Sequence, residues 1–404
     1  MTDVQVRGKK IALLDSSDNI IYTLPDSAGT AGNAIVTDGA GKLFFGGINL
    51  NSVLTAGDSS NLNATILGDV RLGTTVVDSL DFARPGGLAS HGYSIGGASG
   101  PSVTTNLSTA DKFPFSSDTI VSESIIALSS AQRHMGCNAS STHAYSMGAS
   151  HETNPNAVSS RIEKFSFAQQ SNRINDVGDL SQIRIITNDG TQSSTHGYTA
   201  GGNLEVPTPT SASNVIDKFP FSSDTNATDV GDLTQARDFV QKPGSATHGY
   251  AAGGRGVPFP SNNTATNIIE KYPFASDANA ADVGDLALTR THRASSQNSD
   301  TNGYVSGGRS GPPGATLDDI QKFPFVSDGN ATNVGNLNYA RYGNAGSSSQ
   351  SKGYMHGGGR FGHPGPTPFL AHDDISVFPF ATDTAVGYAA ALSTTRWSQG
   401  GTQG

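Results

Sequence analysis

The sequence predicts an all-β protein, a six-bladed β-propeller preceded by a small arm of β-hairpins. Three short elements recur along the chain with the same period. The first contains a tyrosine and two glycines, the second an aromatic-Pro-aromatic segment, and the third a turn rich in Asp and Asn. A period near 50 residues with several short strands in each unit is typical of propeller blades.

The tyrosine element defines the number of blades. Successive tyrosines are separated by 50 to 54 residues, and five of the six copies end in a glycine pair. Aromatic residues that are bounded by glycine turns favour short strands. Six copies predict six blades, with seven as the alternative if the last strand of the chain begins an incomplete blade. The tyrosines are Tyr93, Tyr145, Tyr198, Tyr250, Tyr304 and Tyr354.

The other two elements complete the repeat unit. The aromatic segment reads Phe113-Pro114-Phe115 in its first copy, and the turn reads Asp176-Val177-Gly178-Asp179-Leu180 in a clear copy. No part of the repeat region keeps the 3.6-residue period of a helix over ten residues. An arginine follows four residues after the leucine of each turn, at Arg184, Arg237, Arg290 and Arg341.

The unit resembles the kelch repeat over about residues 80 to 404, although Trp397 is the only tryptophan and the aromatic-Pro-aromatic form is unusual. The resemblance implies a closed ring. The chain ends with a leucine-arginine element, Leu392 to Arg396, that no tyrosine follows. We therefore expect the C-terminal strand to insert beside the first blade, which removes the free edges of the sheets. The propeller domain is expected at residues 79–404.

Residues 1–78 do not follow the repeat and form the predicted arm. Residues 10–14 with 20–24, and 34–36 with 43–45, read as two hairpins with polar turns between them. This opening resembles the N-terminal part of tail-fibre and other virion proteins of phages that infect marine cyanobacteria. The resemblance implies a segment that docks to other virion proteins. It is also a candidate oligomerisation segment. The expected docking residues are Leu14, Ile21, Tyr22, Phe44 and Phe45.

Composition and charge exclude several classes of function. The formal net charge of −9 disfavours wrapping nucleic acid and binding anionic membrane surfaces. Only 15% of residues are charged, and no apolar run is long enough to cross a bilayer. The start of the chain lacks the apolar core of a signal peptide, so we expect synthesis in the host cytoplasm followed by assembly into the virion.

Motifs that match catalytic patterns are explained by the repeat. Gly92 to Gly96 fits the nucleophile elbow of serine hydrolases, but the position of Ser94 holds threonine, alanine, valine or methionine in other copies. Cys137, the only cysteine, lies at an ordinary repeat position near Tyr145. We therefore expect no catalytic residues, no metal site and no cofactor. The Asp-rich turns leave calcium binding as an alternative to turn stabilisation, and the repeated histidines are expected to tie strands to turns.

The most variable loops follow the double glycines and form the candidate binding surface. Loops on a rigid scaffold commonly carry function, and three of these loops begin with an arginine. We expect them to contact a host-surface glycan or protein. The resulting hypothesis is a non-enzymatic structural virion protein, with a cellular protein-interaction scaffold as the alternative. The candidate residues are Arg255, Phe259, Arg309, Arg360, Phe361 and His363.

Overall fold

A computed structural model describes most of the chain from Ala89 onward and the strand backbones of the arm. The described residues of the ring are 89–100, 105–117, 122–126, 128–151, 158–168, 175–186, 189–204, 211–256, 265–290, 294–310, 314–361, 369–383 and 387–404. The chain divides into two units, Met1–Leu80 and Asp81–Gly404, which are described separately.

The arm contains short antiparallel pairs that follow the two predicted hairpins. Strand β2 (Lys10–Leu14) pairs with β1 (Val4–Arg7) and with β3 (Ile20–Thr23), and β4 (Ala34–Thr37) pairs with β5 (Leu43–Gly46). A further pair joins β6 (Val70–Leu72) and β7 (Thr75–Val77). The side chains of the predicted docking residues, Leu14, Ile21, Tyr22, Phe44 and Phe45, lie outside the described residues.

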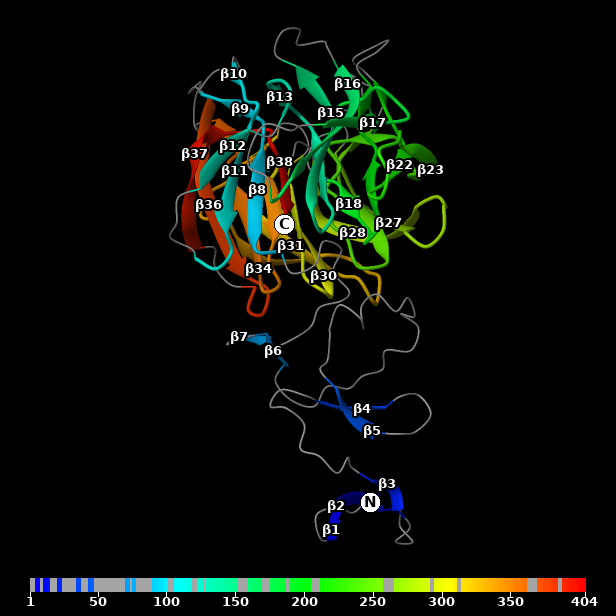
Figure 1. Ribbon diagram of the computed structural model, residues 1–404. Helices are drawn as coiled ribbons and strands as arrows, with labels where there is room; N and C mark the ends of the chain where they lie inside the picture. Colours follow the sequence, from blue (N-terminus) through cyan, green and yellow to red (C-terminus); the bar gives the residue numbers. More distant parts are fainter. Residues whose placement is uncertain are drawn as a thin grey trace. The chain divides into compact units, whose positions relative to one another are not determined.

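The second unit is a six-bladed β-propeller, as predicted (Figure 1). Its described residues form antiparallel strands and no helix. In each blade the tyrosine element is the second strand from the centre and the aromatic element is the third. The Asp/Asn element, predicted as a turn, instead forms the outermost strand in blades 2 to 5, because its backbone pairs with the aromatic strand. From the centre outward, blade 1 contains β38 (Gly400–Gln403), β8 (His91–Ile95), β11 (Thr109–Pro114) and β12 (Glu123–Ile126).

Blades 2 and 3 follow the same order. Blade 2 contains β14 (Gly136–Ala139) with the short β13 (Gln132–Arg133), then β15 (His143–His151), β16 (Val158–Ser166) and β17 (Asn175–Asp179). Blade 3 contains β18 (Thr191–Gln192), β19 (His196–Ala200), β22 (Val215–Pro220) and β23 (Thr228–Asp232).

Blades 4 to 6 complete the ring. In blade 4, bridges from Gln241 and Gly244 take the inner place beside β25 (His248–Ala252), β27 (Thr266–Pro273) and β28 (Ala281–Arg290). Blade 5 contains β29 (Ser295–Asn298), β30 (Asn302–Ser306), β31 (Asp319–Pro324) and β32 (Thr332–Asn336). Blade 6 contains β33 (Ala345–Ser348), β34 (Lys352–His356), β36 (Phe369–Pro379) and β37 (Gly387–Arg396).

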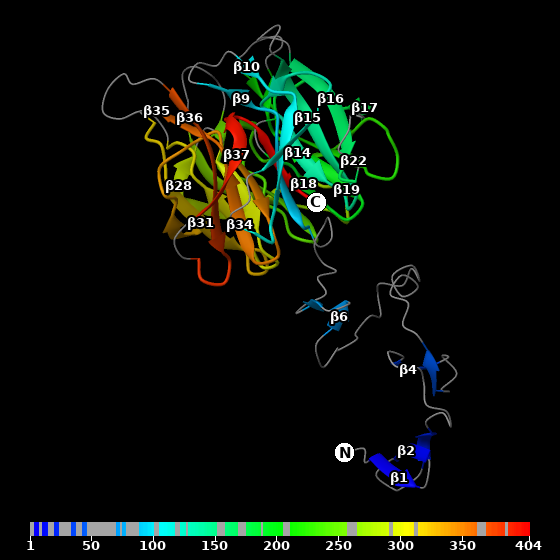
Figure 2. The same ribbon diagram turned by 60° about the vertical axis from the view of Figure 1, so that its left-hand side comes forward.

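The C-terminal strand closes the ring, which confirms the sequence prediction. Strand β38 pairs with β8 through Gly400 and Ile95 at one end and Gln403 and Gly92 at the other. Figure 2 shows the red C-terminal end beside the cyan strand of the first blade. The innermost strand of blade 1 therefore comes from the end of the chain, and its other three strands come from the start of the repeats.

The tyrosines are repeated because each one packs between neighbouring blades. Tyr198 of blade 3 stacks on Phe274 of blade 4 with ring centroids 4.6 Å apart, and its hydroxyl donates to the Phe274 carbonyl at 3.3 Å. All six junctions repeat the ring contact, including the closing one between Tyr354 and Phe115 at 4.6 Å. The remaining pairs are Tyr93–Phe167, Tyr145–Phe221, Tyr250–Phe325 and Tyr304–Phe380.

The repeated arginines form a second set of contacts between blades. Arg184 is fully buried and donates to Asp217 of the next blade at 2.8 Å and to the Val215 carbonyl at 2.9 Å. A buried guanidinium needs such a countercharge and acceptors, because an unpaired charge in the interior is costly. Equivalent pairs are Arg237–Glu270, Arg290–Asp319, Arg341–Asp374 and, across the ring closure, Arg396–Asp111.

Five of the six tyrosines follow a glycine that an aromatic ring covers, whereas Ala144 takes this place in blade 2. A methyl group at Gly249 would lie 2.3 Å from the ring of Tyr272 on the neighbouring strand. The glycine pair has a different cause. Gly201 has a φ of +67°, and a Cβ there would also lie 2.6 Å from the carbonyl oxygen of Arg237. These contacts explain why the repeat keeps its glycines.

Candidate functional site

The ring has two ends that differ in their connections. The end that we call the arginine face carries the loops after the double glycines, which begin near Arg255, Arg309 and Arg360. The opposite end, the histidine face, carries the tight turns that precede the tyrosine strands, as at His143 and His196. Antiparallel strands place alternate connections at opposite ends of a blade, so the described residues that begin these loops, Arg255, Arg309 and Arg360, lie on the same face.

Arg255 on the arginine face is held by its own blade. Its Nε and Nη2 atoms lie 3.0 and 2.5 Å from the carboxylate of Asp238, which is fully buried. The guanidinium also lies over the ring of Phe239, 4.6 Å from its centroid. Arg255 therefore orders the start of its loop, and Phe259, which follows in that loop, lies outside the described residues.

Arg309 and Arg360 also lie over aromatic rings. The Arg309 guanidinium donates to the Gly314 carbonyl at 3.0 Å and lies 5.4 Å from the ring of Tyr342. Arg360 is exposed and lies 5.6 Å from the ring of Tyr339. Guanidinium groups over aromatic rings gain a favourable electrostatic interaction, so these side chains are fixed in orientation.

Arg360 is exposed, whereas Arg255 and Arg309 are partly buried. The Tyr339 ring also packs against His372, with centroids 4.5 Å apart, and its hydroxyl donates to Asp374. Neighbouring Leu370 is 45% exposed. Phe361 pairs with Phe369 through β35 (Gly359–Phe361), but its side chain and His363 lie outside the described residues. Arg360 is therefore the predicted residue that the structure places best for an external contact.

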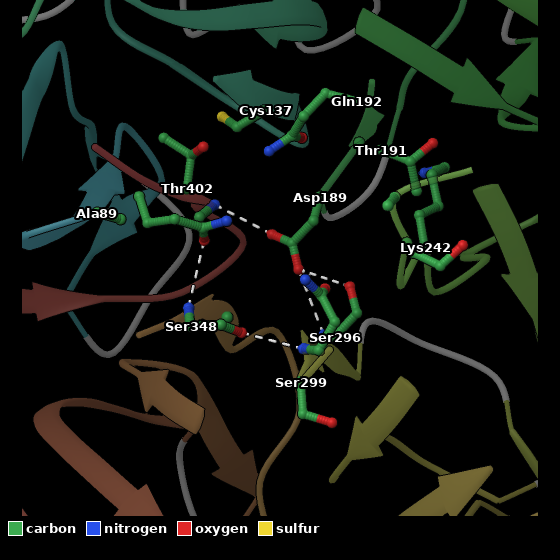
Figure 3. A pocket seen from close by; sticks show the side chains of 18 of the residues that line it. Ala89, Cys137, Asp189, Thr191, Gln192, Lys242, Ser296, Ser299, Ser348 and Thr402 are labelled. Atoms are coloured by element: carbon green, nitrogen blue, oxygen red, sulfur yellow. Dashed lines mark hydrogen bonds between the residues drawn. The ribbon is translucent and has the colours of Figure 1, made fainter. Parts of the chain in front are cut away.

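The sequence analysis missed a polar pocket in the central channel (Figure 3). The inner strands of the blades line it, and they are rich in Gly, Ser, Thr, Asn and Gln. Small residues are required because these strands approach closely. A methyl group at Gly346 would lie 2.2 Å from the Ser296 carbonyl oxygen. This composition, in the segments between each arginine and the next tyrosine, was the available sequence signal.

Asp189 lies in this pocket and connects three blades. It belongs to blade 3, yet its carboxylate accepts hydrogen bonds from the amide and hydroxyl of Ser296 in blade 5, at 3.3 and 2.8 Å. It also accepts from the Gly401 amide of the closing strand at 3.2 Å. Burial raises the pKa of Asp189 to about 6, although these donors lower it. The side chain therefore acts as a link across the channel.

Lys242 in blade 4 lines the same pocket and is 3% exposed. Burial lowers its pKa to about 7, the attraction of Asp189 raises it, and the charge of Arg184 lowers it further. Charged side chains with shifted pKa values inside a pocket are a common feature of binding sites. The channel therefore contains a buried carboxylate and a buried ammonium group, separated from bulk solvent.

The repeated histidines on the histidine face tie strands to turns, as expected. Nδ1 of His143 lies 2.8 Å from the hydroxyl of Thr142, and His196 makes the equivalent contact with Thr195 at 2.8 Å. Burial lowers the pKa of both histidines. Within the described ranges, no group of three or more His, Cys, Asp or Glu side chains is arranged to hold a metal ion.

The Asp and Asn side chains of the third repeat element lie in the outer strands and bond to the backbone two residues further on. The amide of Gly178 donates to Asp176 at 3.4 Å, and that of Gly231 donates to Asp229 at 3.2 Å. The copy with asparagine keeps the contact, because Gly335 donates to Asn333 at 3.1 Å. A role that asparagine can fill does not require the carboxylate charge, so these contacts favour local backbone stabilisation at the irregular register of these strands.

Comparison of the chain with protein-family models and with curated proteins gives no match. No helix in the described part of the chain is long and apolar enough to cross a membrane. The fold and the site geometry therefore carry the functional argument.

Proposed function

We propose that this chain is a non-enzymatic structural virion protein of a bacteriophage, with a kelch-like propeller. The N-terminal arm docks to other virion proteins, and the propeller is displayed for decoration of the particle or for contact with a host glycan or protein. The support for the phage assignment is the resemblance of the arm to virion proteins of marine cyanobacterial phages.

The observation that supports the display role is the position of the first and last described residues of the ring. The amides of Ser90 and His91 donate to the carbonyl of the C-terminal Gly404, both at 2.9 Å, on the histidine face. Ser90 and His91, near the start of the described part of the ring, therefore lie on this face. The arginine face, with its variable loops and Arg360, lies at the opposite end and is the surface that we propose to meet a partner.

The display role is tested by labelling purified virions with an antibody against the propeller, followed by electron microscopy. Discrete label on the tail, neck or capsid supports the proposal and locates the protein. Unlabelled particles with free protein in the lysate contradict it and favour the alternative, a cellular protein-interaction scaffold.

Two variants in the phage genome separate docking from display. Replacement of Phe44 and Phe45 by Asp should remove the protein from particles, because the arm loses apolar contact area. Arg360→Ala should leave the protein on particles and reduce adsorption to the host if the arginine face makes the contact. Normal incorporation of the arm variant would show that docking uses another segment.

A further inference from the structure

The channel pocket reaches the turns of the histidine face and has a polar lining. Its side chains are hydroxyls, carboxamides, charged groups and small residues, and among the lining residues that the structure describes none is aromatic or aliphatic beyond alanine. Such a lining does not favour an apolar ligand, because buried polar groups would lose their hydrogen bonds to water. The lining includes Gln192, Ser245, Asn298, Ser299, Ser348 and Gln403.

The two buried charges in the pocket have opposite signs. The three hydrogen bonds to Asp189 leave about one of the roughly four acceptor positions of a carboxylate. The ammonium group of Lys242 has three donors, and the residue also makes a contact within the protein. Burial raises the pKa of Asp189 to about 6 and lowers that of Lys242 to about 7. Contacts within the protein therefore offset only part of the free-energy cost of removing either charge from water.

We propose that the channel pocket binds a small zwitterion, a compact molecule that carries one ammonium and one carboxylate group, such as a free amino acid. The ligand ammonium lies against Asp189, and its carboxylate lies against Lys242. A ligand with one charge is attracted by one of these side chains and repelled by the other. A neutral polyol makes hydrogen bonds to both, but bonds with charge on both partners are about twice as strong.

Calorimetric titration of the full-length protein with each of the standard free amino acids tests this proposal. The tightest binder is then compared with its amide, which lacks the negative charge, and with its N-acetyl derivative, which lacks the positive charge. Each derivative should bind at least about tenfold more weakly, because one charged hydrogen bond is lost. Binding above pH 7 should also take up a proton, because the ligand carboxylate favours the charged form of Lys242.

Three variants assign the binding to the pocket. Lys242→Gln and Asp189→Asn should each weaken binding at least about tenfold. Asp300→Asn is the matched control, because it removes a carboxylate from the lining without changing the two proposed charge contacts, and it should change affinity less than about threefold. Asp189→Asn also disturbs the contact to Gly401. Lys242→Gln therefore carries the test if melting shows that Asp189→Asn is unfolded.

Several results would overturn the proposal. One is the absence of heat with any amino acid at roughly 20 mM, a concentration that detects affinities in the millimolar range. A second is equal binding of the singly charged derivatives, and a third is undiminished binding to Lys242→Gln. Binding of a monosaccharide when no amino acid binds would assign the pocket to polyols instead. The titrations need only purified protein, so their failure leaves the virion proposal untouched.

Discussion

Replacement of Arg396 by Met removes a buried ion pair that joins the last blade of the ring to the first. Arg396 ends β37, and its guanidinium donates to Asp111 of blade 1 at 2.6 Å. It also donates to the carbonyls of Thr109 and Gly96, at 2.8 and 3.0 Å. Methionine retains much of the apolar stem of arginine but supplies no donor, so the substitution mainly removes the charge and its hydrogen bonds.

The expected loss of stability follows from what the substitution leaves behind. Asp111 is fully buried and keeps the hydroxyls of Ser122 and Ser393 as donors, at 3.1 and 2.8 Å, but has no countercharge from Arg396. Breaking a buried pair in this way costs about 3–5 kcal/mol. For a unit of about 320 residues with an unfolding entropy of about 2.1 cal/mol/K per residue, this corresponds to a fall in Tm of about 4–7 °C.

Scanning calorimetry of the full-length protein measures this fall. The double variant Arg396→Met/Asp111→Leu should recover at least about half of it, because no charge is left buried without a partner. Lys218→Met is the control, since its partner Asp277 is 56% exposed, and such surface pairs contribute about 0–1 kcal/mol. An Arg396→Met protein that melts within about 1 °C of the parent would refute the reasoning.

Three further predictions test the packing and the buried histidine. Gly249→Ala should destabilise the protein by about 1–3 kcal/mol in urea unfolding, because its methyl group would lie 2.3 Å from Tyr272, whereas Gly387→Ala, with its nearest contact at 3.9 Å, should be nearly neutral. Tyr354→Ala should cost about 3–5 kcal/mol and Tyr354→Phe less than about 1.5 kcal/mol, since the hydroxyl contact is long at 3.5 Å; similar losses would show that the ring stack contributes little. Burial and the charges of nearby arginines lower the pKa of His356 to about 3 from 6.5, so its contribution to stability is complete above pH 6.5 and is lost as the pH falls toward 3. His356→Met should therefore unfold less steeply in acid than the parent, and an unchanged acid profile would contradict the buried neutral state.

The repeat could be predicted because each blade makes the same contacts with the next. Tyr198 must reach Phe274, and Tyr250 must reach Phe325, so both partners recur with the same period. The arginine that follows each turn recurs for the same reason. Short-range patterns of this kind are visible in the sequence because every copy meets the same packing requirement.

The acidic partners of the arginines were harder to predict because they change position. In blade 3 the acid, Asp217, directly precedes the lysine of the aromatic strand, whereas in blades 5 and 6 it is Asp319 and Asp374, two residues earlier. Residues two apart on a strand face the same side of the sheet, so the pair is kept. At the junction between blades 1 and 2, Gln132 replaces the arginine and donates to Glu163 at 3.1 Å.

The sequence alone predicted a ring of six blades with seven as the alternative, the order of the repeated elements and the closing role of the C-terminal strand, because these depend on contacts repeated at a constant spacing. Only the tertiary structure revealed the channel pocket. Asp189 meets Ser296 and Gly401, which are 107 and 212 residues away, and no other blade repeats this set of contacts among the described residues. Which side chains meet across the channel depends on the diameter of the closed ring and the tilt of its inner strands, and no local pattern encodes these quantities.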